Sequence, residues 1–421
     1  MDLSGKKVAI IGLGKSGQAA ARLLATCRAR PRVSEQKSGP ADENDFIRWT
    51  QGKDIPVEYG HSEAFVTDSD LVVISPGVRS DSQAVRWARA KGLPVWAEIE
   101  LAARFCPCPI IAVTGSNGKT TVTTLIRDIL AEGGYHAITA GNIGSPFCER
   151  VQELDSHSWA VVEVSSFQLE SIVSFKPHVA VFLNFSQNHL DRHKDMEEYF
   201  SAKKRIFLNQ DKNDFAVLNA GDVKLRALES ELHARVVFFN REVEDEDPVG
   251  PNPNARAAYR VGRLAGIPDD VCRRVIRDFK GVEHRLEQVR CLQGVDYIND
   301  SKATTVEAGR WALERIDRPI VMICGGRDKQ IDFTPLRDLV RRKVRQMIVI
   351  GEAKDKIMAA FQSEVDMMPQ DDLSGAVRAA RELARSGDCV LLSPMCASFD
   401  MFRNFEERGR IFKELVNRLP E

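Results

Sequence analysis

A lysine and a threonine in this chain follow a loop that is bracketed by two glycines. The loop comes directly after the run Ile110 to Val113, whose apolar and β-branched residues indicate a buried strand. Gly115 and Gly118 let backbone N–H groups turn inward, and the helical pattern that resumes after the loop adds the positive potential of a helix N-terminus. Lys119 can reach the terminal phosphates of a nucleotide, and Thr120 can offer its hydroxyl to a magnesium ion. We therefore expect this stretch to bind ATP.

Polar side chains stand at the ends of the apolar runs that follow. Glu163 lies within the run Trp159 to Val164, and His189 comes after the run His178 to Leu183. A buried carboxylate is costly unless it meets a cation or hydrogen-bond donors. Ligands of parallel sheets bind beyond the carboxyl ends of the strands. We expect Glu163 to lie beside a magnesium ion and His189 to be a second metal ligand. A hydrogen-bonded structural carboxylate is the alternative for Glu163.

A second glycine-rich turn lies near the start of the chain. The strand Lys7 to Ile11 leads into Gly12, Gly14 and Gly17 in the spacing G-x-G-x-x-G, and Glu35 follows eighteen residues after the last glycine. Taken alone, this pattern supports an NAD-dependent dehydrogenase. Its physical content is that a pyrophosphate can approach the turn, and UDP also carries a pyrophosphate. Close packing of helix on strand is a purely structural alternative for these glycines.

The composition limits the possible classes of protein. The 421 residues are 43% hydrophobic and 28% charged, so a sizeable core is expected. The formal net charge of −1 gives no electrostatic footprint for nucleic acid or for a membrane surface. No apolar run approaches the roughly 20 residues of a membrane span, and the N-terminus has no signal-peptide pattern. Nine scattered cysteines are typical of reduced thiols in a cytoplasmic enzyme.

Strands and helices alternate along the whole chain, which predicts an α/β protein with mostly parallel sheets. We expect three domains. We expect a Rossmann-like domain at residues 1–97, a central P-loop mononucleotide-binding domain with a parallel sheet at residues 98–282, and a C-terminal Rossmann-like domain at residues 283–421.

The motifs, taken together, resemble those of the Mur ligase family. The stretch Gly115 to Thr121 looks like the ATP loop of that family. Stretches similar to its other motifs are Glu163 to Glu170, His189 to Arg192, Glu283 to Glu287, Asn299 to Thr304, and Leu392 to Asp400 with Asn404-Phe405 and Arg408-Gly409. They occur in order over nearly the whole chain, so chance matching is remote.

This resemblance implies an activity and its participants. It implies ATP-dependent amide bond formation between the carboxylate of UDP-N-acetylmuramoyl-L-alanine and D-glutamate, through an acyl phosphate, in peptidoglycan precursor synthesis. It also implies a cytoplasmic enzyme that uses ATP as cosubstrate and magnesium at two sites. We expect a monomer with no nucleic-acid or membrane partner.

The resemblance also assigns residues to roles. The catalytic residues are Lys119, Glu163, His189, Lys203 and Lys302. ATP binding falls on Gly115, Ser116, Asn117, Gly118, Lys119, Thr120, Thr121, Asn254, Arg285, Asp300 and Lys302, with Asp300 positioning Lys302. The UDP substrate is assigned to Gly14, Lys15, Ser16, Gln36, Ser75, Gly77, Asn142 and His189. D-Glutamate is assigned to Thr304, Lys329, Ser398, Phe399 and Phe405. The metal ligands are Thr120, Glu163, His189 and Lys203 in a CO2-modified, carbamylated form.

The sequence around Lys203 bears on whether this lysine can be carbamylated. Carbamylation requires a neutral amine, which the neighbouring charges of Lys204 and Arg205 would favour by lowering the lysine pKa. Without the resemblance, Lys203 would be a solvated helix residue.

The family has two asparagines near the adenine. Here Asn254 matches the second, Pro251 takes the place of the first, and the preceding segment is short. At the uracil site, Glu35-Gln36-Lys37 differs from the usual pattern, which contains Asp.

Three alternatives remain open. One is an NAD-dependent oxidoreductase, which leaves Lys119, Lys302 and Lys329 unexplained. Another is a regulatory nucleotide-binding protein that has lost catalysis. The third is a ligase of the same family that adds a different amino acid.

Overall fold

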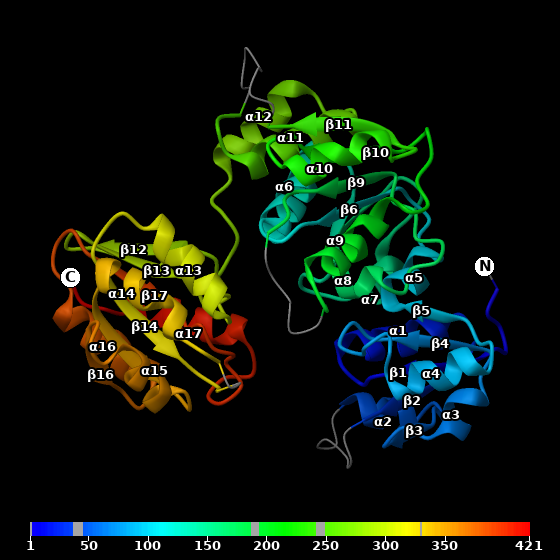
Figure 1. The fold of residues 1–421 in the computed structure, drawn as a ribbon, viewed down its shortest axis with the longest axis horizontal. Coiled ribbons are helices and arrows are strands. Elements are labelled where there is room, and N and C mark those ends of the chain that lie inside the picture. The colour runs from blue at the N-terminus through cyan, green and yellow to red at the C-terminus, as the bar shows by residue number, and fades with distance from the viewer. Residues whose placement is uncertain (1, 37–44, 187–192, 241–248, 329–330) are drawn as a thin grey trace. The chain divides into compact units, whose positions relative to one another are not determined.

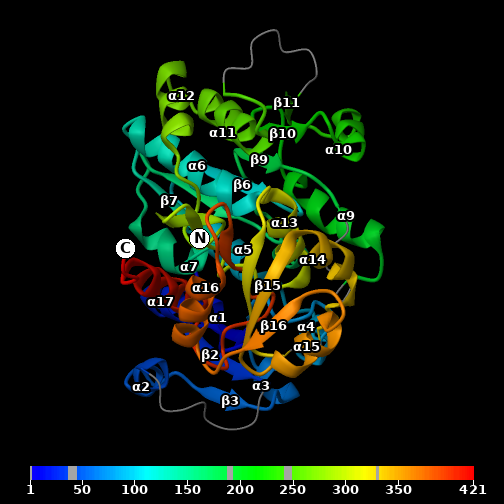
Figure 2. The same ribbon diagram turned by 90° about the vertical axis from the view of Figure 1, so that its left-hand side faces the viewer.

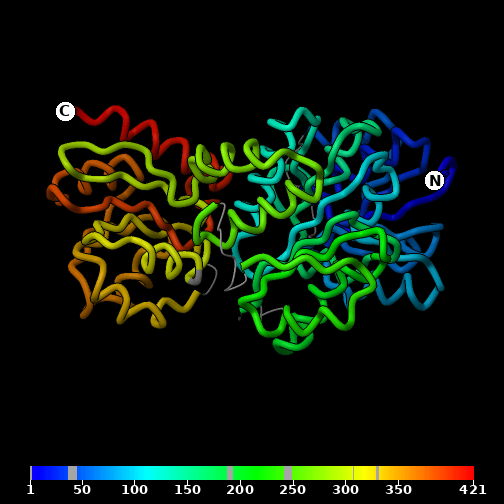
Figure 3. Tube along the Cα trace, turned by 90° about the horizontal axis from the view of Figure 1, so that it is seen from above, coloured from blue at the N-terminus to red at the C-terminus, as the bar shows by residue number. Residues whose placement is uncertain are grey.

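Three sheets form where the sequence shows its apolar, β-branched runs (Figure 1). The computed structural model describes residues 2–36, 45–186, 193–240, 249–328 and 331–421. The chain divides into two compact units, Met1–Phe279 and Lys280–Glu421. The first unit contains two sheets and the second contains one. The passage from α12 (Asp269–Asp278) into the second unit can be followed in Figure 3.

The N-terminal sheet consists of parallel strands only. Its strands are β1 (Lys7–Ile11), β2 (Arg30–Glu35), β3 (Val57–Tyr59), β4 (Leu71–Ile74) and β5 (Val95–Ala97), in the order β3-β2-β1-β4-β5. Its helices are α1 (Lys15–Thr26), α2 (Asp45–Gln51), α3 (Glu63–Thr67), α4 (Gln83–Ala90) and α5 (Glu98–Ala103). The chain leaves β1 toward β2 and later returns to its other side as β4. This reversal opens a crevice at the carboxyl end of β1.

The central sheet is also parallel throughout. Its strands are β6 (Ile110–Thr114), β7 (Ala137–Gly141), β8 (Trp159–Glu163), β9 (Val179–Phe182), β10 (Phe215–Asn219) and β11 (Arg235–Phe239), in the order β11-β10-β9-β6-β8-β7. The α-helices that accompany α12 are α6 (Lys119–Glu132), α7 (Phe147–Arg150), α8 (Ser166–Leu169), α9 (Met196–Lys204), α10 (Val223–Ala227) and α11 (Pro253–Leu264). Short 3-10 turns cover Val151–Glu153, Arg205–Phe207 and Leu228–Ser230.

Alternate residues of the buried strand β6 face two different apolar layers, as the two-residue period of a strand requires. Ile111 and Val113 pack with the helices α6, α11 and α12, which lie together (Figure 2). Ile110 and Ala112 belong to the layer that contains α7, α8 and α9. This second layer continues into α1 and α5, so the first two sheets share a core.

The C-terminal sheet is mostly parallel and ends in one antiparallel pair. Its strands are β12 (Glu287–Leu292), β13 (Val295–Asn299), β14 (Ile320–Gly325), β15 (Val344–Ile350), β16 (Asp366–Pro369) and β17 (Cys389–Leu392), in the order β12-β13-β17-β14-β15-β16. Only β12 and β13 run antiparallel. Its helices are α13 (Val306–Arg315), α14 (Arg337–Lys343), α15 (Lys354–Phe361), α16 (Leu373–Leu383) and α17 (Phe405–Asn417), with a 3-10 turn at Thr334–Leu336.

Strands β3, β7, β11, β12 and β16, which the sequence analysis did not identify, each lie at the edge of their sheet. Edge strands are partly exposed, so their apolar periodicity is weak. None of the helices in the described ranges combines the length and the apolar character needed to cross a bilayer.

Candidate active site

The predicted phosphate loop joins β6 to α6. Gly115 has φ 151° and Gly118 has φ 82°, which are conformations that side chains disfavour. A Cβ at Gly118 would lie 2.4 Å from Oδ1 of Asn254, so the adenine-site asparagine predicted from the sequence lies against the loop. The helix then begins at Lys119, so the positive end of its dipole faces the loop. The backbone therefore has the form that binds a phosphate group.

The segment after β9 holds this loop in place. The backbone N–H of Ser116 donates to Asn184 O over 3.0 Å, and that of Asn117 donates to the Asn184 side chain over 2.9 Å. The Ser116 hydroxyl donates to Ser186 O over 3.0 Å and accepts the Ser186 N–H over 2.9 Å. These contacts join residues about 70 positions apart in the chain, so the loop is built by the tertiary fold as well as by its glycines.

Thr120, Glu163 and Asn142 form one hydrogen-bonded chain at the carboxyl ends of β6, β8 and β7. The Thr120 hydroxyl donates to Oε2 of Glu163 over 2.8 Å, and Nδ2 of Asn142 donates to Oε1 over 2.9 Å. The Glu163 side chain is only 2% exposed. The two donors offset part of the cost of burying the carboxylate. They also place its oxygens between the phosphate loop and the residue assigned to the UDP substrate.

Lys203 is buried, contrary to what its sequence alone suggests. It lies in α9, is 1% exposed, and its Nζ donates to Gly115 O over 3.0 Å. Burial lowers the pKa of Lys203 well below its ordinary value, and the charge of Lys119 lowers it further, while Glu163 acts in the opposite direction. Lys119 Nζ donates to the same carbonyl over 2.9 Å.

The sequence analysis was wrong to expect that Lys204 and Arg205 lower the pKa of Lys203. Lys204 forms an ion pair with Glu231, and the Arg205 side chain donates to the carbonyl oxygens of Leu169 and Ile172. Neither contributes to the lowered pKa of Lys203, because desolvation and Lys119 cause it.

Thr121 lies half-buried in the first turn of α6. His189, the remaining predicted metal ligand, lies outside the described residues.

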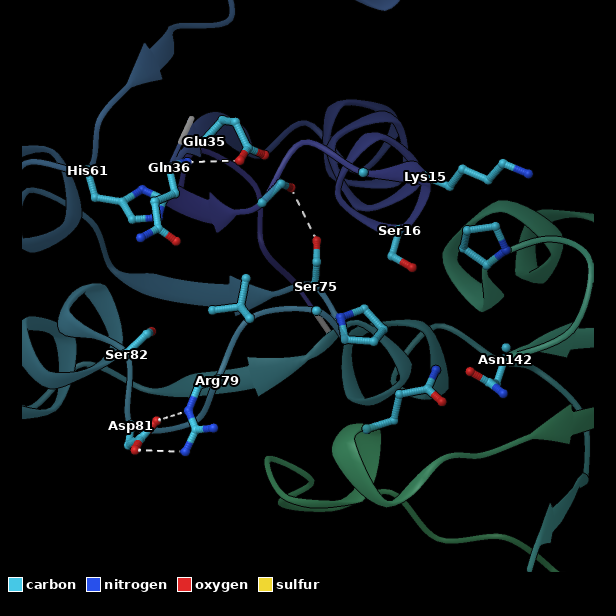
Figure 4. Close-up of a pocket in the computed structure, with 18 of the residues that line it drawn as sticks. Lys15, Ser16, Glu35, Gln36, His61, Ser75, Arg79, Asp81, Ser82 and Asn142 are labelled. Carbon is cyan, nitrogen blue, oxygen red and sulfur yellow. Dashed lines mark hydrogen bonds and ion pairs between the residues drawn. The ribbon is translucent and has the colours of Figure 1, made fainter. Parts of the chain in front are cut away.

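A pocket of about 900 Å³ opens beside the glycine-rich turn of the N-terminal sheet (Figure 4). The UDP-substrate residues predicted from the sequence that line it are Gly14, Lys15, Ser16, Gln36, Ser75, Gly77 and Asn142. A Cβ at Gly17 would lie 1.9 Å from Gly12 O, so glycine is required where α1 packs on the turn. Asn142 brings the pocket to the Glu163 carboxylate, because the two side chains are hydrogen-bonded.

Glu35, the acid that the dinucleotide-binding pattern singled out, lines this pocket, and both of its carboxylate oxygens accept backbone hydrogen bonds. Its Oε2 accepts the Leu13 N–H over 2.7 Å, within the glycine-rich turn, and its Oε1 accepts the Gln36 N–H over 3.0 Å. The sequence analysis missed other residues that line the pocket, including His61, Arg79 and Asp81. A single histidine or ion pair in a loop carries no recognisable signal in one sequence.

The second unit gathers its predicted residues at the carboxyl ends of β13 and β17. Asp300 is 3% exposed, and burial raises its pKa to about 7. Its side chain accepts hydrogen bonds from the Leu286 N–H and the Ser393 hydroxyl. Lys302 Nζ lies 5.9 Å from the centre of the Phe405 ring. Asp300 thus fixes the turn that carries Lys302.

The residues predicted for the amino acid have different exposures. Ser398 is 2% exposed, whereas Phe399 is 58% exposed, and Thr304 and Phe405 are half-buried. Lys329 lies outside the described residues. The guanidinium of Arg285 lies 4.8 Å from the centre of the Trp311 ring. These positions all belong to the second unit.

Arg408 joins the loop that contains Ser301 to the loop that contains Cys396. Its side chain is 1% exposed and donates to the hydroxyl and carbonyl of Ser301 over 3.0 and 2.9 Å and to Cys396 O over 3.2 and 3.3 Å. Burial lowers its pKa to about 10. The sequence analysis found Arg408 in a motif and gave it no role. A buried arginine that joins two loops could be found only from the structure.

The ligand atoms of Glu283, His284 and Glu287 in the second unit lie within 4.8 Å of one another. Lys413 Nζ donates to both carboxylates, over 2.6 and 2.9 Å. The two carboxylates of this cluster therefore already have a cationic partner. The cluster is also far in the sequence from the predicted metal ligands Thr120, Glu163 and Lys203.

These features define the class of protein. A parallel α/β sheet with a glycine-bracketed phosphate loop, and a buried carboxylate beside the loop threonine, are characteristic of nucleotide-binding enzymes of the phosphate-loop type.

Comparisons with known proteins identify the family. Residues 6–97 match the Mur ligase MurD-like N-terminal domain, residues 113–255 the Mur ligase middle domain, and residues 284–396 the Mur ligase glutamate ligase domain. The chain belongs to the Mur ligase family. It is 42% identical to the UDP-N-acetylmuramoylalanine–D-glutamate ligase of Koribacter versatilis, covering 100% of this chain and 99% of the relative. It is 41% identical to the ligase of the same name from Pelodictyon phaeoclathratiforme, with coverage of 100% and 99%.

Solved structures share the fold. The MurF ligase of Thermotoga maritima in complex with ADP aligns with a TM-score of 0.61 and 15% identity, covering 99% of this chain and 96% of that one. The UDP-N-acetylmuramate-alanine ligase MurC of Thermotoga maritima aligns with a TM-score of 0.60 and 18% identity, with coverage of 98% and 99%. Together these findings confirm the three-domain α/β fold expected from the sequence.

Proposed function

We propose that this chain is an ATP-dependent ligase that joins D-glutamate to UDP-N-acetylmuramoyl-L-alanine. The observation that carries the proposal is the chain of Thr120, Glu163 and Asn142, which connects a phosphate loop to a nucleotide-sized pocket through a single buried carboxylate. The identity of about 40% to ligases of that name supports the same substrates. The proposal includes a monomer that works in the cytoplasm, where ATP and UDP-sugars are available.

Amide synthesis requires an activated carboxylate. In the proposed reaction, the muramoyl-alanine carboxylate attacks the γ-phosphorus of ATP, which forms an acyl phosphate and releases ADP. The amine of D-glutamate then attacks the acyl carbon, phosphate leaves, and the amine loses a proton. The phosphate-loop amides and Lys119 would hold the β- and γ-phosphates, and fixed positioning supplies much of the rate.

The first-unit residues suit magnesium. Magnesium prefers oxygen ligands from carboxylates, hydroxyls and phosphates, and Thr120 and Glu163 present two such oxygens 2.8 Å apart. We propose that these two residues hold one magnesium ion and that His189 and Lys203 hold a second. Magnesium would offset the repulsion between the substrate carboxylate and ATP. ATP in turn would contact Asn254, and Arg285, Asp300 and Lys302 of the second unit.

The chemistry of Lys203 fits a carbamate. Its lowered pKa leaves part of the amine neutral, and a neutral amine adds to CO2 with loss of one proton. The carbamate converts a cationic donor into an anionic oxygen ligand. It would also remove the repulsion between Lys203 and Lys119, whose ammonium groups share the Gly115 carbonyl.

D-Glutamate is assigned to the second unit. Ser398 and Thr304 offer hydroxyl donors, Phe399 and Phe405 offer apolar contacts, and Lys329 offers a charge for the side-chain carboxylate. We propose functional boundaries at 1–97 for the UDP-sugar, 98–282 for ATP, and 283–421 for ATP and D-glutamate.

The decisive experiment measures phosphate release from ATP in the presence of UDP-N-acetylmuramoyl-L-alanine. D-Glutamate is compared with L-alanine, L-lysine and diaminopimelate. Phosphate release with D-glutamate, and not with the other three amino acids, supports the proposal. Preference for another amino acid would make the chain a different ligase of the family. Binding of NADH and not of UDP would instead support an oxidoreductase.

A further inference from the structure

Three polar side chains form a hydrogen-bonded chain at one end of the N-terminal pocket. The hydroxyl of Ser34, which is fully buried at the end of β2, lies 3.0 Å from Oε1 of Glu58 and 2.7 Å from Nδ1 of His61. Glu58 also accepts the Ser62 N–H over 2.9 Å and the Ser62 hydroxyl over 2.5 Å. His61 lines the pocket. The imidazole is thus held from behind by groups that do not themselves reach the pocket.

The positions of the protons in this chain follow from its donors and acceptors. A carboxylate only accepts hydrogen bonds, so the single hydroxyl proton of Ser34 is directed to Glu58. The Ser34 oxygen must then accept from His61, which places a proton on Nδ1. Burial lowers the pKa of His61, against the opposing effect of Glu35 and Glu58, so the ring is neutral at pH 7. Its Nε2 therefore carries a lone pair and can only accept.

The direction of the bound substrate decides what meets this lone pair. Asn142 lines the pocket and is hydrogen-bonded to Glu163, so the reacting end of the substrate must lie on the Asn142 side. The glycine-rich turn with Ser16 suits the diphosphate. Figure 4 shows His61 and Gln36 on the opposite side of the pocket from Ser16 and Asn142. The nucleobase is the part of a nucleoside diphosphate that remains for the His61 end.

We propose that His61 selects the nucleobase of the substrate, with its Nε2 accepting a hydrogen bond from N3–H of a uracil ring. This inference rests on the proposed function, because it requires that the pocket holds a nucleoside diphosphate. Cytosine carries a lone pair at N3, which would face the lone pair of Nε2. A polar site rejects a base that leaves its buried groups unpaired. His61 is then a specificity-determining residue, and Ser34 positions it by fixing its tautomer.

The neighbouring side chains are consistent with this assignment. Gln36 lines the same end of the pocket, and its side-chain amide can donate to a uracil carbonyl oxygen. The carboxylate oxygens of Glu35 accept the Leu13 and Gln36 N–H groups. His61 thus offers an acceptor, and Gln36 a donor, for a base that presents N3–H between two carbonyl groups.

The first test needs no mutation. Isothermal titration calorimetry on the full chain compares UDP with UDP methylated at N3, which keeps the ring and loses the donor. We expect UDP to bind about tenfold more tightly or better, since an unpaired buried acceptor weakens binding. Equal affinity for the two ligands would overturn the proposal.

The second test uses variants that have retained their melting temperature. His61→Ala should bind UDP and N3-methyl-UDP with nearly equal affinity, whereas His157→Ala, at an exposed histidine, should keep the wild-type ratio. Ser34→Ala leaves the imidazole in place and frees its tautomer, so its affinity for CDP relative to UDP should rise. A His61→Ala protein that keeps the full preference for UDP would show that another group reads N3.

A spectroscopic readout separates this role from simple support of the turn. The 15N shifts of the His61 ring, assigned by their loss in His61→Ala, should show a protonated Nδ1 and a bare Nε2 in the wild type. Protonation at Nε2 would contradict the proposal. Ligase activity with an unchanged ratio of affinities would remove only the role of His61. Failure of the wild-type chain to bind UDP or to ligate would remove the proposed function itself.

Discussion

Lys119 and Lys203 donate hydrogen bonds to the same carbonyl oxygen, that of Gly115, over 2.9 and 3.0 Å. Lys119 comes from the start of α6 and is half-buried, whereas Lys203 comes from α9 and is almost fully buried. Burial lowers the pKa of Lys203, and the repulsion from the neighbouring Lys119 charge lowers it further. This pairing supports the two different roles that we propose, in which Lys119 is a cation for phosphates and Lys203 is an amine for modification.

Replacement of Lys119 by alanine should lower turnover by roughly 100-fold or more, because a positioned charge on the transferred phosphate is lost. The melting temperature should change little, since the side chain is half-buried and outside the core. Turnover and melting temperature are measured on the same preparation, with Lys53→Ala at an exposed position as the control. Near-normal turnover would remove the assignment of the phosphate loop.

Replacement of Lys203 by alanine should inactivate the enzyme, and added acetate should restore part of the activity by supplying a carboxylate to the vacated position. Lys204→Ala is the matched control, because that neighbouring lysine is paired with Glu231 and contributes nothing to the Lys203 pKa. Carbon-13 bicarbonate NMR tests for the carbamate directly. A substrate-bound, metal-loaded crystal with an unmodified Lys203 would contradict the proposal.

Glu98 should make the stability of the fold depend on pH. Its side chain is buried where α5 meets α7, it accepts the Cys148 N–H, and burial raises its pKa from 4.5 to about 7. Between these values the native state binds more protons than the unfolded state, so Glu98 lowers stability progressively as pH rises from 4.5 to about 7.

The Glu98→Gln variant should remove that dependence. Its free energy of unfolding relative to wild type should increase from pH 5 to pH 8 by at most roughly 3 kcal/mol. Urea unfolding at several pH values measures the difference. A difference that is the same at pH 5 and pH 8 would show that Glu98 does not titrate in this range.

Lys329→Ala should lower kcat/KM for D-glutamate by roughly 30-fold or more, since loss of one partner of a desolvated pair costs about 2–5 kcal/mol. The KM for UDP-N-acetylmuramoyl-L-alanine should be nearly unchanged. Lys356→Ala is the control, because Lys356 forms an ion pair with Asp328 beside the proposed site. Weakened nucleotide-sugar binding with unchanged D-glutamate kinetics would place the amino-acid site elsewhere.

Local features could be predicted from the sequence because their causes are local. The phosphate loop needs an apolar strand, two glycines with positive φ, and a helix that starts at the lysine, and all are adjacent in the chain. The interior strands β6, β8 and β9 were found for the same reason, since burial on both faces makes them continuously apolar.

The edge strands and the environment of individual side chains depended on the tertiary structure. β7 and β11 were missed because an edge strand is only partly buried and shows a weaker pattern. Lys203 reads as a solvated helix residue until α9 packs over the phosphate loop and removes its water. His61 is one histidine among eight in the sequence, and only its contact with the buried Ser34 hydroxyl fixes its tautomer.

The sequence by itself thus determined the chemical groups, the family and the α/β layers, because these depend on residue types, their spacing and periodicity. The tertiary structure decided which of those groups meet. Thr120 and Glu163 are 43 positions apart in the chain, and their contact exists because β6 and β8 are neighbours in the central sheet. Burial, protonation and hydrogen-bond direction follow from such non-local contacts, which no local sequence pattern encodes.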